Sequence, residues 1–160
     1  MLKRLSEVEG LVENAARGES DQASQALTGF LVIRSCGYLE KVVESCVLEY
    51  VESMSAPAVL NFVMGAFGRG ANPQPDRLIA LVKRFDARWA SELNQLFAAD
   101  DGQLKREVAF LVSCRNKIAH GESESVAHLK ALKLSKFAQK VANWFIDTFD
   151  PPPSQQNLRA

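Results

Sequence analysis

The segment Ser113-Cys114-Arg115-Asn116-Lys117-Ile118-Ala119-His120-Gly121 closes a stretch whose apolar residues recur at three- and four-residue steps. Those apolar residues are Val108, Leu111, Cys114 and Ile118. Their spacing predicts an amphipathic helix from about Leu104 to His120, and Gly121 suits the left-handed position that ends many helices. The end of this helix gathers two cations, an amide and an imidazole, which are side chains suited to binding phosphate and moving protons.

Helical periodicity also accounts for most of the remaining chain. Ser6 and Glu9 have the spacing of a capping box, and Asp76 is placed to cap a later helix. The breaks fall at Gly18, at 100–102 and at the Pro-rich segment after Asp150. Besides 104–120, the expected helices cover about residues 6–17, 21–54, 57–67, 76–99 and 125–149.

The fold class that follows is all-α, a compact antiparallel bundle of five to six helices. A chain of 160 residues can bury a substantial core as one unit. We expect residues 1–149 to form a single helical domain and residues 150–160 to be a disordered C-terminal tail.

Composition limits the possible partners and the cellular setting. The chain has 19 basic and 19 acidic residues and a net charge of zero, so nucleic acid would have to bind a local patch. Three cysteines, Cys36, Cys46 and Cys114, lie in apolar patterns without metal-ligand spacing, which favours a reducing, cytoplasmic setting. We expect no signal peptide, no membrane span and no cofactor. We also expect no metal site, since His128 is eight residues from His120 with no ligand pattern around them.

The helix end suits the cleavage of RNA. Asn116 and His120 are four residues apart and share a helix face, which the long side chain of Arg115 can reach. A ribose 2′-hydroxyl attacks its adjacent phosphate when one group takes its proton and another protonates the leaving oxygen, and a histidine can do either. An arginine can hold the phosphate oxygens and stabilise their growing charge. No metal is needed for this reaction.

Each chain supplies only one such histidine. Two copies related by a two-fold axis would place two sets of Arg115 and His120 around one groove, so we predict a homodimer with the site at its interface. The residue types also fit a purely structural role, in which the arginine and histidine cap carbonyls at the helix end.

Other candidates have structural alternatives of their own. One basic stripe on the last helix could follow an RNA backbone or be a solvated face, and it consists of Lys130, Lys133, Lys136 and Lys140. Arg34, Glu40 and Glu44 favour structural salt bridges, and Arg115 is one possible partner of the two glutamates. The larger aromatic side chains could stack on bases, but their helical spacing favours core packing; they are Trp89, Phe137, Trp144 and Phe145.

The heptapeptide from Arg115 to Gly121 resembles the R-x4-6-H motif of the HEPN superfamily, with a polar residue directly after the arginine. The order of helices also agrees, because the motif lies on the penultimate helix and a long helix comes early. The segment 30–51, with Gly37-Tyr38-Leu39-Glu40, resembles the early helix of the RiboL-PSP type. The resemblance covers roughly residues 20–149.

What the resemblance implies is a metal-independent endoribonuclease that dimerises around a shared cleft and leaves a 2′,3′-cyclic phosphate. Arg115 would bind the phosphate, Asn116 would orient the pair, His120 would handle protons or the scissile phosphate, and Lys117 would assist electrostatically. Such proteins often serve in toxin–antitoxin, anti-phage defence or RNA-processing systems, which makes an antitoxin or defence-complex protein a possible partner. The alternatives are a catalytically inactive HEPN module for dimerisation or partner binding, and a regulator that binds a nucleotide phosphate through Arg115 and Lys117.

Overall fold

Every regular element in the described part of this computed structural model, residues 2–15, 21–66, 70–122 and 126–150, is a helix. The all-α prediction with up to six helices is confirmed. In chain order the helices are α1 Leu2–Ala15, α2 Asp21–Met54, α3 Pro57–Ala66, α4 Pro75–Lys83, α5 Ala87–Ala119 and α6 His128–Phe149.

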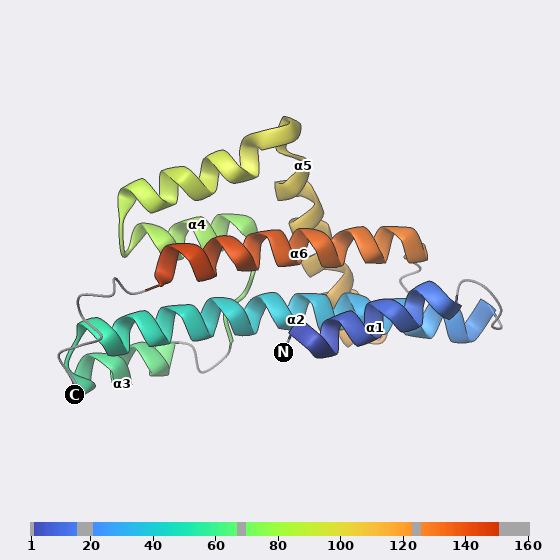
Figure 1. Cartoon of the computed structure of the whole chain (residues 1–160), viewed down its shortest axis with the longest axis horizontal. Coiled ribbons are helices and arrows are strands. Elements are labelled where there is room, and N and C mark those ends of the chain that lie inside the picture. Colours follow the sequence, from blue (N-terminus) through green and yellow to red (C-terminus); the bar gives the residue numbers. More distant parts are fainter. Residues whose placement is uncertain (1, 16–20, 67–69, 123–125, 151–160) are drawn as a thin grey trace.

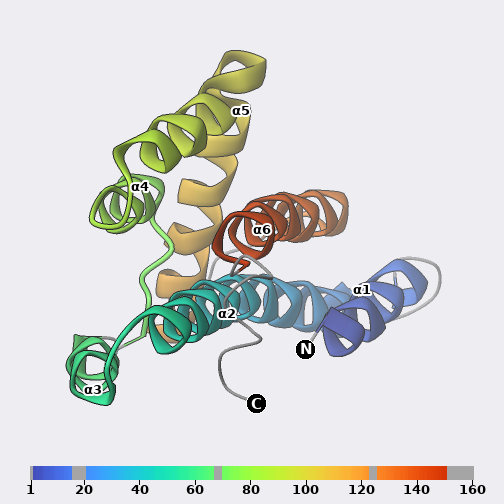
Figure 2. The same cartoon turned by 60° about the vertical axis from the view of Figure 1, so that its left-hand side comes forward.

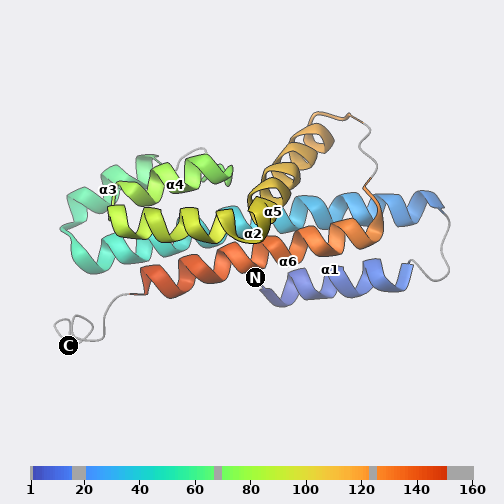
Figure 3. The same ribbon diagram turned by 90° about the horizontal axis from the view of Figure 1, so that it is seen from above.

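Helix α2 is the long central element against which most of the others lie (Figure 1). Helix α1 runs antiparallel to α2 on one side, and α6 lies along α2 in the same direction (Figures 1 and 3). Helix α4 and the first half of α5 form an antiparallel pair that lies to one side of α6 (Figure 2). The second half of α5 descends from this pair to cross α2 (Figure 2).

The core follows from the apolar stripe of α2. Leu31, Leu39 and Val43 are fully buried there, and they face a core completed by Leu134 and Phe145 of α6. Burying each such side chain stabilises the fold by about 1.5–3 kcal/mol. Trp89, Phe137 and Trp144 pack against this core as half-buried side chains, and Phe145 is fully buried, so the prediction of core packing for these aromatics is confirmed.

The break expected at residues 100–102 redirects α5. Asp100, Asp101 and Gly102 all take left-handed backbone angles, with φ of 52°, 53° and 73°, so the helix turns sharply between two straight halves. Arg106 donates to the carbonyl of Asp101 and braces the turn. The second half of α5 therefore approaches α2, where Ile118 Cδ1 would lie 3.8 Å from a Cβ on Gly29.

One helix boundary was missed. The expected helix over residues 76–99 is two helices, because the chain turns at Arg84 and α5 starts afresh after Asp86. The Asp86 carboxylate accepts a hydrogen bond of 2.6 Å from the Arg88 amide and so caps the new helix. Apolar residues continue at helical spacing through Phe85 and Trp89, which hid the turn in the sequence.

Two predicted caps are wrong. Ser6 lies inside α1, where its hydroxyl donates to the Leu2 carbonyl at 3.3 Å. The helix begins before Ser6 because its buried stripe already includes Leu5. Asp76 lies in the first turn of α4, whose cap position is Gln74, and it pairs with Lys105 at 2.7 Å. The other boundaries of α2 and α3 agree with the sequence to within a residue.

Three expectations concern residues outside the described ranges: the stop at Gly18, the helix start at Ser125 and the tail at 151–160. Helix α6 begins at His128. No helix in the described ranges is long and apolar enough to cross a membrane.

Candidate active site

The predicted motif occupies the last two turns of α5, where that helix meets α2. Cys114 is buried and Ile118 is half-buried, so this face of the helix joins the core. Arg115 is half-buried at the edge of the contact, whereas Asn116 and His120 are exposed. The apolar spacing thus places the polar residues at the rim of the core.

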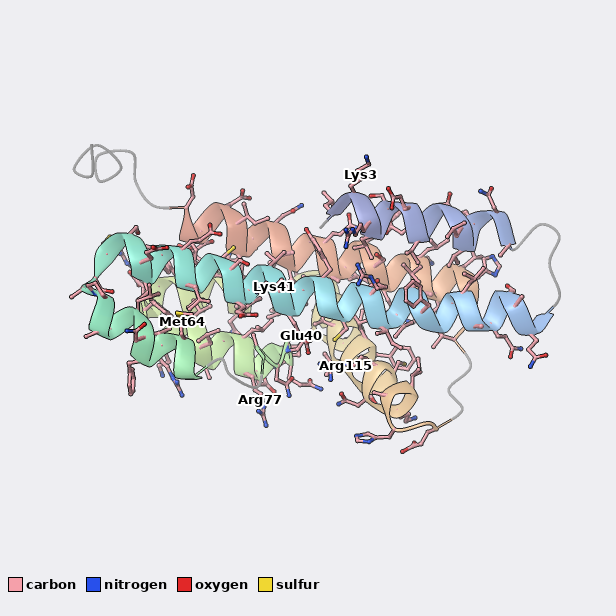
Figure 4. All side chains as sticks on the ribbon, turned by 90° about the horizontal axis from the view of Figure 1, so that it is seen from below. Lys3, Glu40, Lys41, Met64, Arg77 and Arg115 are labelled. Atoms are coloured by element: carbon pink, nitrogen blue, oxygen red, sulfur yellow. The ribbon has the colours of Figure 1, made fainter. Side chains whose placement is uncertain are left out.

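Arg115 is held by side chains from both helices. Its Nη2 forms an ion pair with Glu40 of α2, and its Nη1 donates to Asn116 Oδ1 at 3.0 Å. Figure 4 shows Arg115 and Glu40 facing each other across the α2–α5 contact. The two side chains are 30% and 25% exposed, so the pair is partly shielded from water. Of the partners that the sequence left open for Glu40, the structure shows Arg115.

Cys36 is a third neighbour of the guanidinium. Burial raises the pKa of the Cys36 thiol, and the hydrogen bond and charge of Arg115 partly oppose that rise. Cys36 and Glu40 are four residues apart, so α2 presents both to Arg115 from one face. Sequence reasoning treated Cys36 only as a small apolar residue, although its spacing from Glu40 was a usable signal.

His120 occupies the helix end that the sequence assigned to it. Gly121 follows with φ of 77°, and the Glu122 amide donates to the Lys117 carbonyl at 3.0 Å, which closes the helix in the expected left-handed cap. The imidazole makes no hydrogen bond or ion pair with the described side chains. The structure therefore joins Arg115 and Asn116, and leaves His120 exposed on the next turn.

Only one lysine of the basic stripe on α6 forms an ion pair with a described residue. Lys130 pairs with Glu107 of α5 at 2.7 Å and lies over the Phe110 ring at 5.2 Å, so it holds α6 against α5. The other members of the stripe are exposed; they are Lys133, Lys136 and Lys140. Lys117 on α5 is also exposed.

The remaining charged candidates have local roles. Glu44 pairs with Lys41 one turn earlier, at 3.3 Å. Arg34 forms no ion pair with the described residues, contrary to the expected salt bridge, and instead lines a shallow pocket with Leu5 and Tyr38. Its long side chain can leave the guanidinium in water while the stem covers apolar surface.

One cavity lies away from the motif. It measures about 530 Å³ between α2 and the end of α6, with Cys46, Glu49 and Phe149 in its wall. None of the predicted site residues lines it. Among the described residues no three His, Cys, Asp or Glu side chains cluster as metal ligands would.

Comparison with known protein families gives one match. The family described as RiboL-PSP-HEPN matches residues 1–150, which includes every helix of the structure. No curated protein and no solved structure matches the chain.

Proposed function

Since the chain belongs to the RiboL-PSP-HEPN family, we propose that it is a metal-independent endoribonuclease in which Arg115 and His120 carry the chemistry. The observation that supports this most is the fixed position of Arg115. An arginine held by Glu40 and Asn116, with an exposed imidazole on the next turn of the helix, provides the groups for binding a phosphate and moving a proton, and helix capping alone would need neither partner.

The proposed reaction is a transesterification within the RNA strand. The ribose 2′-oxygen bonds to its adjacent phosphorus, the bond from phosphorus to the 5′-oxygen of the next nucleotide breaks, and a 2′,3′-cyclic phosphate and a 5′-hydroxyl remain. One group accepts the 2′-hydroxyl proton and another donates a proton to the leaving oxygen. His120 is suited to either step because its imidazole is exposed.

Arg115 would bind the phosphate undergoing attack. A guanidinium has five N–H donors in a rigid plane, and Glu40 and Asn116 engage one nitrogen each, so donors remain for the non-bridging oxygens. Since those oxygens gain charge in the transition state, a pre-positioned cation stabilises it more than it stabilises bound RNA. Asn116 and Glu40 would act as positioning residues.

A homodimer would complete the site. One chain provides a single His120, whereas the reaction moves two protons. The edge of α2 beside the motif is open and partly apolar: Phe30 and Ile33 are 48% and 37% exposed, and a Cβ added at Gly37 would meet nothing within 4 Å. Phe30 directly follows Gly29, which contacts the motif helix at Ile118. A second copy seated on this edge would bring two motifs together, and sedimentation equilibrium at micromolar concentration should report twice the chain mass.

The decisive experiment blocks the attacking 2′-hydroxyl of the RNA substrate. Purified protein in EDTA should cleave an RNA oligonucleotide and leave cyclic phosphate ends. The same oligonucleotide with 2′-O-methyl groups should bind and stay intact, because the attacking oxygen is blocked. Cleavage of the methylated strand, or activity that EDTA abolishes, would contradict the mechanism.

One observation favours a second candidate, an inactive HEPN module that dimerises or binds a partner protein. Glu40 neutralises Arg115, and no described side chain orients the imidazole of His120. If this candidate is correct, RNA profiles will be the same with and without the protein, while the dimer still forms. For either candidate the family resemblance favours an antitoxin or a defence-complex protein as partner.

A further inference from the structure

A second pocket, outside the motif, carries chemistry that the proposed reaction does not use. It has a volume of about 340 Å³ and lies where the loop before α4 meets that helix. Arg77 of α4, Arg84 at the C-cap of that helix and Asn72 of the loop supply its polar wall, and Leu78 and Leu81 supply its apolar wall. No acidic side chain lines it.

Both arginines in this pocket are available to a ligand. Arg77 and Arg84 are exposed, and neither guanidinium forms an ion pair or a side-chain hydrogen bond with the described residues. They are seven residues apart, and Arg84 keeps right-handed helical backbone angles at the C-cap of α4, so two helical turns place them on one face. The nearby acid Asp76 is already paired with Lys105. Two unneutralised guanidinium groups therefore share one concave surface.

The loop side of the pocket adds an oriented donor. Asn72 Oδ1 accepts a hydrogen bond of 3.1 Å from the backbone N–H of Gln74, which fixes the Asn72 side chain. Its Nδ2 group can then donate to an oxygen of a ligand. Two guanidinium groups and an amide donor, with no carboxylate in the pocket wall, are a set of groups suited to binding phosphate.

The position of the pocket relates it to the motif. The Asp76–Lys105 pair joins the start of α4 to α5, and Lys105 lies ten residues before Arg115, about 15 Å along the helix. In Figure 4 Arg77 and Arg115 lie along the same edge of the molecule, whereas Lys3 lies along the opposite edge. A single strand a few nucleotides long can extend from one arginine to the other.

We infer that the pocket of Arg77, Arg84 and Asn72 is a phosphodiester-binding subsite that holds the RNA strand at a distance from the bond cleaved at Arg115. The inference rests on the proposed ribonuclease function for its choice of ligand. Because the contacts are to the backbone, they carry no base preference, and they bind substrate and transition state alike.

The test is binding of a fluorescent 2′-O-methyl RNA oligonucleotide, which cannot be cleaved, measured by anisotropy over a range of salt concentrations. The double variant Arg77→Ala, Arg84→Ala should bind at least about tenfold more weakly. Its slope of log affinity against log salt should be shallower by about 1.4, since each single-strand phosphate contact contributes about 0.7. The control Lys3→Ala, Arg4→Ala removes the same charge from exposed positions on α1 and should leave both values unchanged.

Cleavable RNA gives an independent measurement. With a long strand the Arg77→Ala, Arg84→Ala variant should raise KM and leave kcat unchanged, because it removes uniform binding. With a dinucleotide, which is too short to reach the pocket, variant and wild-type protein should have the same rate. Equal affinities and slopes for both double variants would overturn the subsite. Arginine-dependent binding without any cleavage would support the subsite and reject the nuclease.

Discussion

Glu40→Gln removes the charge that faces Arg115 and keeps the size of the side chain. At an effective dielectric constant of about 20, charges about 4 Å apart attract by about 4 kcal/mol, but the cost of dehydrating and ordering a partly exposed pair leaves a net of about 1 kcal/mol. The Glu40 and Arg115 side chains are 25% and 30% exposed, so this ion pair is partly exposed and the net value of about 1 kcal/mol applies to it. We expect the free energy of unfolding to fall by about 1 kcal/mol and the melting temperature by about 2–4 °C.

The assay is urea unfolding of a double-mutant cycle that combines Glu40→Gln with Arg115→Gln. Coupling of about 1 kcal/mol between the two changes would measure the pair itself, free of effects that either change has alone. Glu44→Gln is the matched control, because it removes a carboxylate one turn further along α2 whose partner, Lys41, is 49% exposed. That control should cost only a few tenths of a kcal/mol. Equal losses from Glu40→Gln and Glu44→Gln, with no coupling to Arg115, would refute the reasoning.

The same variant should affect cleavage more than folding. If Glu40 fixes the guanidinium for the transition state, Glu40→Gln should lower kcat/KM by about 10–100-fold, the loss of one charge-assisted contact of about 1.5–3 kcal/mol. Glu44→Gln should leave the rate within about twofold of wild type. An unchanged rate for Glu40→Gln would restrict Glu40 to a structural role.

Further predictions concern the helix ends and the thiols. Gly121→Ala should cost about 1–2 kcal/mol in urea unfolding, because φ of 77° is strained for a residue with a Cβ. Hydrogen bonds from Arg88 lower the pKa of Asp86, so this carboxylate stabilises the fold fully above its unfolded pKa of about 4 and loses that effect as the pH falls through its lower folded pKa. Asp86→Asn should therefore flatten the decline of melting temperature below about pH 4. Burial, together with the charge of Glu49, raises the pKa of Cys46 to about 11, so iodoacetamide at pH 8 should modify it far more slowly in the native protein than in urea.

Much of the fold could be predicted because its signals are local. The apolar stripe of α2 and the Asp-Asp-Gly break in α5 depend on neighbours along the chain, and both were found correctly. The turn before Asp86 was missed because Phe85 and Trp89 keep helical spacing across it and pack on the same aromatic cluster with Tyr50. Tertiary packing, which the sequence does not display, overrode the periodic pattern there.

The residues of the candidate site could be proposed from the sequence, but most of the side chains that contact Arg115 could not. Residue types and spacing were enough to propose Arg115, Asn116 and His120 and to place them at the end of a helix. Two partners of Arg115, Glu40 and Cys36, come from α2, 75 or more residues earlier in the chain, so only a general expectation for Glu40 was possible and Cys36 went unnoticed. Arg77 and Arg84 were missed for the same reason, since their pocket exists only where the loop before α4 folds back on that helix.

The most direct test compares wild-type protein with His120→Ala on a mixed RNA pool in EDTA, followed by end-group analysis. His128→Ala is the matched control, because it removes the only other histidine, a half-buried residue at the start of α6. Circular dichroism and sedimentation serve as controls that all three proteins are folded and in the same oligomeric state. We predict cyclic phosphate ends from wild type and His128→Ala, and none from His120→Ala. Equal cleavage by His120→Ala and wild type, or no cleavage by any of the three, would contradict the assignment of this site as a ribonuclease.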